Sequence, residues 1–135
     1  MIKHWQSLPQ SNRLAAAVIL MLTLVVITPL CGFLFQCGCD WPWQGLEAGC
    51  NFYQPQAPHK CPWCVSMLMG VVSTGIAIAS GVMVALWVPT LWQTGTQSAV
   101  LMRILQGFAV FFVLALLLAD IAAKWQLYPF GIGSV

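Results

Sequence analysis

Two long apolar runs without a charged residue constrain the fold of this chain more than any other feature. They cover residues 14–35 and 65–88. A helix rises about 1.5 Å per residue, so about 20 residues cross the hydrocarbon core of a bilayer. A third apolar stretch, residues 103–123, fits the same length if Arg103 reaches one interface and Asp120 lies at the other. The sequence therefore predicts an all-α integral membrane protein with three transmembrane helices.

The composition supports this class and excludes others. Charged residues make up 6% of the 135 residues, and hydrophobic residues make up 60%. Such a chain cannot coat a water-facing surface, so its main partner is the lipid bilayer. A net charge of +2 is too small to predict a nucleic-acid partner. We expect one three-helix domain over residues 1–135, with a Cys- and Trp-rich loop at 36–63 and a tight hairpin between the second and third helices.

The few basic residues suggest an orientation. Lys3, Arg13 and Arg103 fall on one side of the predicted membrane, and Lys60 and Lys124 fall on the other. Loops that remain in the cytoplasm carry an excess of lysine and arginine. The pattern favours a bacterial inner membrane protein with a cytoplasmic amino terminus and a periplasmic cysteine loop. At the end of the third helix, Asp120 and Lys124 have the four-residue spacing of a helical ion pair.

Six cysteines gather at one side of the predicted membrane. They are Cys31, Cys37, Cys39, Cys50, Cys61 and Cys64. An even number of cysteines in an oxidising compartment is typical of a disulfide framework. A short loop rich in proline and glycine cannot build its own apolar core, so covalent links would stabilise it. All six cysteines are therefore disulfide candidates, in pairings that the sequence does not determine.

A metal site is the second interpretation of the same loop. Cys37 and Cys39 form one close thiol pair, and Cys61 and Cys64 form another, with His59 just before the second pair. Four such ligands suit a tetrahedral zinc ion, and soft thiolates also suit Cu(I). The candidate cofactor under this interpretation is zinc or copper.

Thiol–disulfide exchange is the third interpretation. Cys61-Pro-Trp-Cys64 has the Cys-x-x-Cys spacing of dithiol oxidoreductases and stands at the predicted start of a helix, where the helix dipole favours a thiolate. Cys37 and Cys39 would then pass electrons onward. Outside these four cysteines, the sequence offers no catalytic constellation, and we lean against an enzyme.

Small residues recur at three- and four-residue steps along the second predicted helix. They are Ser66, Gly70, Ser73, Thr74, Ala77 and Gly81. Such a face lets another helix approach closely, either within the chain or in a partner subunit. From this face and the lack of a catalytic constellation, we expect an accessory or assembly subunit of a larger membrane complex, with a disulfide- or metal-stabilised extracytoplasmic cap. A metal-binding membrane protein and a membrane oxidoreductase are the alternatives.

Overall fold

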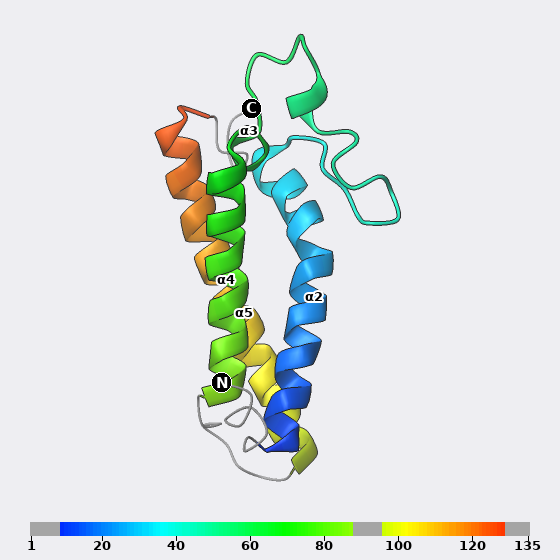
Figure 1. Cartoon of the computed structure of the whole chain (residues 1–135), viewed down its shortest axis with the longest axis vertical. Helices are drawn as coiled ribbons and strands as arrows, with labels where there is room; N and C mark the ends of the chain where they lie inside the picture. Colours follow the sequence, from blue (N-terminus) through cyan, green and yellow to red (C-terminus); the bar gives the residue numbers. More distant parts are fainter. Residues whose placement is uncertain (1–8, 88–95, 129–135) are drawn as a thin grey trace.

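Three long helices lie side by side in this computed structural model, which describes residues 9–87 and 96–128 (Figure 1). They are α2 (Gln10–Phe35), α4 (Met67–Trp87) and α5 (Thr96–Trp125). Each is long and apolar enough to cross a membrane, and the described residues contain no strand. The predicted all-α fold with three membrane helices is confirmed.

The cysteine loop stands at one end of this bundle and contains little regular structure (Figure 1). Between α2 and α4 the chain forms one 3₁₀ turn, η1 (Asn51–Tyr53), and one short helix, α3 (Pro62–Val65). The helix expected to start at residue 65 is therefore split into α3 and α4. Ser66 separates them because its backbone is extended, at φ −113° and ψ 99°. Its hydroxyl then accepts a hydrogen bond from the Met69 N–H at 3.3 Å, which replaces a missing helical partner.

The third membrane helix is longer at both ends than the sequence predicts. It begins at Thr96 and continues through Arg103, whose guanidinium donates to the Ala85 carbonyl at 3.1 Å. The expected hairpin connection falls mainly on residues 88–95, which lie outside the described residues. Near the opposite end of α5, Lys124 and Asp120 form the predicted ion pair at 2.7 Å.

Small residues bring α4 and α5 into close contact. A Cβ atom on Gly81 would lie 2.8 Å from the Gly107 carbonyl oxygen, so the two backbones nearly touch. Ser73 and Ala77 of the small-residue face are also buried within the chain. At the loop end, a Cβ on Gly70 would lie 2.4 Å from the Trp63 carbonyl oxygen. Most of the face is therefore occupied by the chain's own helices.

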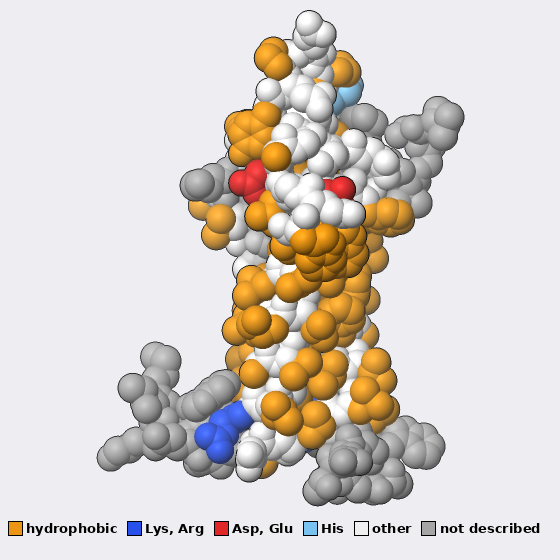
Figure 2. Space-filling view, turned by 90° about the vertical axis from the view of Figure 1, so that its right-hand side faces the viewer, with side chains coloured by type: hydrophobic (Ala, Val, Ile, Leu, Met, Phe, Trp, Pro, Cys, Tyr) orange, Lys and Arg blue, Asp and Glu red, His pale blue; other side chains and the backbone are white. Residues whose placement is uncertain are grey.

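Charged side chains lie toward both ends of the bundle. Figure 2 shows an apolar belt along the helices, with basic side chains at one end and acidic side chains near the other. Arg13 lies in the first turns of α2, far along the helix from the cysteine loop. At that same end, the Asn12 amide donates to the Leu86 carbonyl at 2.9 Å and ties α2 to α4. The cysteine loop and Arg13 thus lie at opposite ends of the membrane-spanning bundle.

Candidate metal centre

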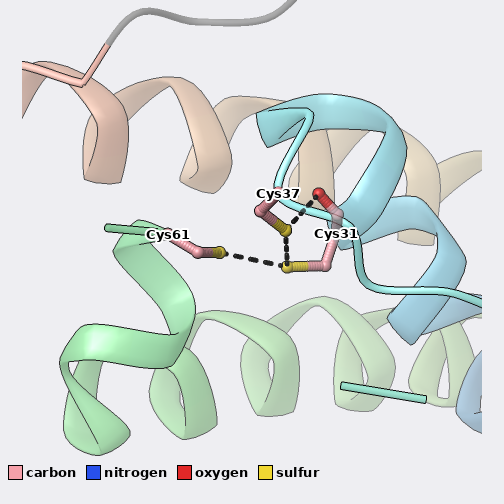
Figure 3. Close-up of side chains that lie close together, drawn as sticks. All are labelled: Cys31, Cys37 and Cys61. Carbon is pink, nitrogen blue, oxygen red and sulfur yellow. Dashed lines mark hydrogen bonds between the residues drawn. The ribbon is translucent and has the colours of Figure 1, made fainter. Parts of the chain in front are cut away.

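Six cysteine side chains meet where the cysteine loop folds over the end of α2. Cys31 belongs to the last turns of α2, and Cys61 is the residue that caps the start of α3. Figure 3 shows the thiols of Cys31, Cys37 and Cys61 pointing toward one another from three segments of the chain. Cys39, Cys50 and Cys64 complete the group, which we call the sulfur cluster.

Five pairs of sulfur atoms lie close to van der Waals contact. The measured Sγ–Sγ distances are 3.4 Å for Cys31–Cys61, 3.8 Å for Cys31–Cys37, 3.4 Å for Cys37–Cys39, 4.0 Å for Cys39–Cys64 and 3.3 Å for Cys50–Cys64. A disulfide bond is about 2.05 Å long. All six cysteines are described, and all are free thiols, so none of the expected disulfides is formed here.

The sulfur cluster contains four overlapping triads, and the members of each triad all lie within 4.8 Å of one another. The triads are Cys31–Cys37–Cys61, Cys31–Cys39–Cys64, Cys37–Cys39–Cys50 and Cys50–Cys61–Cys64. Each cysteine belongs to two of these four triads, and any two of the four share one cysteine. The same sulfur pairs also close four further triads, which are Cys31–Cys37–Cys39, Cys31–Cys61–Cys64, Cys37–Cys50–Cys61 and Cys39–Cys50–Cys64. No four of the six sulfurs lie within 4.8 Å of one another. The arrangement therefore offers several three-sulfur sites and no compact four-sulfur site.

The ligands expected from the sequence overlap only partly with this group. Cys37, Cys39, Cys61 and Cys64 all belong to the sulfur cluster, but His59 joins none of the triads. Its side chain is exposed, and its ring packs edge-on against Tyr128 at a centroid distance of 5.9 Å. The loop carries His59 outward before turning back at Cys61, so the imidazole lies away from the sulfurs.

The centre includes two further cysteines. The spacing of cysteine pairs in the sequence did not identify them as metal ligands. Cys31 and Cys50 are isolated in the sequence, and each takes part in two triads. Cys31 reaches the centre because the chain after α2 turns back over the helix. A Cβ atom on Gly32 would lie 1.8 Å from the Cys39 carbonyl oxygen, so only glycine permits this crossing. The glycine that directly follows Cys31 is the one feature of the sequence that could have indicated Cys31 as a ligand.

The centre is buried from solvent. Cys50 and Cys61 are 0% exposed and Cys37 is 2% exposed, whereas Cys64 is only half-buried. Burial raises the pKa of Cys50 to about 12, so without a bound cation this thiol is neutral at pH 7. A metal ion that binds the Cys50 sulfur must therefore displace its proton.

A polar network around Asn51 holds the loop against the helices. The Asn51 side-chain oxygen accepts from the Cys61 N–H at 2.8 Å, and the Asn51 N–H donates to the Cys37 carbonyl at 2.6 Å. The Asn51 amide nitrogen donates to the Tyr128 hydroxyl at 2.9 Å, and that hydroxyl donates to the Phe35 carbonyl at 2.7 Å. Burial raises the pKa of Tyr128, which keeps its hydroxyl protonated as a donor. The side chains of Asn51 and Tyr128 thus link the middle of the loop to Cys61, near its end, and to Phe35, the last residue of α2.

A cavity of about 300 Å³ opens beside the sulfur cluster. One whole triad, Cys31, Cys39 and Cys64, lies in its wall. The remaining lining comes from α2, α4, Trp63 and the loop residues Glu47, Phe52 and Tyr53. Cys64, the least buried thiol, therefore has a route to the outside of the chain.

Trp63 lies in the core beside the sulfur cluster. It is 6% exposed and packs edge-on against Phe35 at a centroid distance of 5.3 Å. The two aromatic rings cover one side of the site and exclude water from it.

Comparisons with known proteins give this arrangement no relative. No family model matches the chain, no curated sequence matches it, and no solved structure matches its fold.

Proposed function

We propose that this chain is a metal-binding membrane protein, which holds thiophilic metal ions in the sulfur cluster at one end of its helix bundle. One observation carries the proposal: buried cysteine sulfurs from separate segments converge into four triads, each within 4.8 Å. Soft thiolate ligands select copper(I), zinc and iron–sulfur clusters over hard cations. The donor set at this site contains sulfur alone.

The number of neighbours around each thiol favours metal over disulfides. A disulfide requires one partner per cysteine, whereas each sulfur here lies within 4.8 Å of four other sulfurs. Ionised thiolates in such a group repel one another and need cations between them. The nearest lysine in the loop, Lys60, donates to the backbone carbonyls of Asn51, at 3.2 Å, and Gln54. A bound metal would supply the charge that these thiolates need.

The burial of Cys61 speaks against a thiol–disulfide oxidoreductase. An attacking cysteine must reach the disulfide of its substrate, and Cys61 is 0% exposed. Cys64 is more accessible, but it contacts Cys50 at 3.3 Å and also shares triads with Cys31 and Cys39. A thiol held among so many others is suited to ligation.

We also propose that the metal site faces the periplasm of a bacterial inner membrane. Arg13 and Arg103 lie toward the end of the bundle opposite the sulfur cluster. Under the positive-inside rule, the end with these arginines faces the cytoplasm. The role as an accessory subunit has less support, because Ser73, Ala77 and Gly81 pack within the chain.

Elemental analysis of the purified chain tests this function. We expect protein from cells grown with added zinc and copper, extracted in mild detergent without chelator, to carry at least one equivalent of a thiophilic metal. Cys61→Ser should lose most of that metal, because Cys61 is a buried member of two triads. His59→Ala, two positions away and exposed, should retain it.

The proposal would be overturned by either of two results. One is wild-type protein that carries no zinc, copper or iron although its cysteines are intact. The other is an equal loss in Cys61→Ser and His59→Ala, which would show that the metal binds at the exposed part of the loop.

A further inference from the structure

We propose that the sulfur cluster binds four copper(I) ions as one tetranuclear thiolate cluster. One ion occupies each of the four triads, and each cysteine sulfur bridges two ions. This inference rests on the proposed function and specifies its metal, its stoichiometry and the role of each cysteine.

The sharing of cysteines among triads carries the argument. Twelve of the fifteen sulfur pairs lie within triads, so the six sulfurs have the connectivity of an octahedron with eight triangular faces. Ions in two faces that share two sulfurs would lie too close together, so at most four faces can be filled at once. The four triads named first share only single cysteines, and they have the connectivity of a tetrahedron. The triads are its four corners, and the six cysteines are its six edges. Cys31, for example, joins the triad that contains Cys37 and Cys61 to the triad that contains Cys39 and Cys64. A sulfur that lies on an edge can donate one lone pair to each of two metal ions.

The distances agree with three-coordinate ions. For metal–sulfur bonds of about 2.3 Å, three sulfurs placed around one ion at 120° lie about 4.0 Å apart. The five shortest sulfur separations run from 3.3 Å for Cys50–Cys64 to 4.0 Å for Cys39–Cys64, and every pair within a triad lies within 4.8 Å. Metal ions at the triad centres would draw the closest sulfurs apart by less than about 1 Å. The site therefore needs only a small adjustment to receive them.

Zinc fits the same sulfurs poorly. Structural zinc is almost always tetrahedral, so a single ion would need four sulfurs that are all close to one another. Any four of the six cysteines include one of the pairs Cys31/Cys50, Cys37/Cys64 or Cys39/Cys61, and these pairs share no triad. Four zinc ions would each need a fourth ligand. Among the described residues, no histidine or carboxylate joins a triad, whereas copper(I) is satisfied by three soft ligands.

The binding step balances without any change of oxidation state. Six neutral thiols and four copper(I) ions form four three-coordinate sites and release six protons. The product carries six thiolate charges and four copper charges, so its net charge is −2. No electron is transferred, and each bridging sulfur forms two copper–sulfur bonds in place of its one sulfur–hydrogen bond.

The cavity provides a path for the ions. Cys31, Cys39 and Cys64 form the one triad that lies entirely in its wall, and Cys64 is the least buried cysteine. The other triads each contain at least two cysteines that are fully or almost fully buried. Copper should therefore enter at the triad in the cavity and pass inward through the shared sulfurs.

Anaerobic titration of the full, reduced chain in detergent with copper(I), in competition with a coloured copper(I) chelator, tests the stoichiometry. We expect four ions per chain, taken up with few intermediates in native mass spectra because neighbouring ions share sulfurs. A plateau at one, two or three ions would overturn the tetranuclear cluster while leaving a metal-binding protein. No binding by six reduced thiols would overturn the proposed function itself.

Serine substitutions test the bridging role. Since every cysteine bridges two ions, each single Cys→Ser variant should bind fewer than four copper ions, including Cys31→Ser and Cys50→Ser. His59→Ala is the matched control and should still bind four. If Cys31→Ser or Cys50→Ser binds four ions as tightly as the wild type, these cysteines are not ligands and the cluster is refuted. The plateau itself reports on binding even if a variant is less stable.

Discussion

Removing the metal should expose the cysteine loop to trypsin, with cleavage after Lys60 accelerated more than about 100-fold. Within residues 36–61, all of which the structure describes, the buried residues are the cysteines Cys37, Cys39, Cys50 and Cys61. The loop therefore has no apolar core apart from its sulfurs. Metal binding to a thiolate site contributes on the order of 10 kcal/mol to folding, and cleavage requires local unfolding.

The measurement is a time course of tryptic digestion of the reduced protein, loaded with copper(I) or stripped by a thiol-compatible chelator. Lys60 is the one lysine or arginine in residues 36–61, so this cut is read directly from the fragment masses. The helical signal in circular dichroism serves as the control, because α2, α4 and α5 pack on one another without the loop. Equal cleavage rates with and without metal would contradict a metal-stabilised loop.

Gly32→Ala should remove at least half of the bound copper although it leaves all six cysteines in the chain. The added methyl group would lie 1.8 Å from the Cys39 carbonyl oxygen, and that neighbour is backbone, which cannot rotate away. The loop must move off α2, which separates Cys39 from Cys31. Since Cys39 belongs to two triads, two of the four ion sites lose a ligand. Overpacking of this kind costs about 1–3 kcal/mol or more in stability.

Gly75→Ala is the control for this substitution. Gly75 lies in α4, and a Cβ there meets nothing within 4 Å. Copper capacity and the protection of Lys60 from trypsin should both match the wild type in Gly75→Ala and both fall in Gly32→Ala. If Gly32→Ala binds a full complement of copper, the close crossing of Cys39 over α2 is not needed for the site.

The membrane helices could be predicted from the sequence because crossing a bilayer depends on local composition. Hydropathy and length alone locate three such segments, and the structure agrees. The helix ends could not be predicted in the same way. The break at Ser66 and the passage of α5 through Arg103 depend on partners in the folded chain, namely the Met69 N–H and the Ala85 carbonyl.

Only part of the sulfur cluster could be predicted from the sequence, for a similar reason. Spacing identifies close pairs such as Cys61 and Cys64, but it assigns no partner to an isolated residue. Cys31 and Cys50 reach the centre because the chain folds back over α2, which only tertiary structure can show. Proximity along the chain also suggested His59 as a ligand, and the path of the loop carries it away. The mutual proximity of the six sulfurs is a property of the folded loop.

The most direct test of the account is the native mass of the intact chain, extracted from copper-supplemented cells without reductant or added chelator. A three-helix protein built around a copper–thiolate cluster should have the mass of the chain plus four copper ions, less the six thiol protons. Acid and chelator should then release a metal-free chain with six thiols that can be alkylated. A metal-free chain that is lighter by the hydrogens lost in three disulfides, and resists alkylation, would contradict the account.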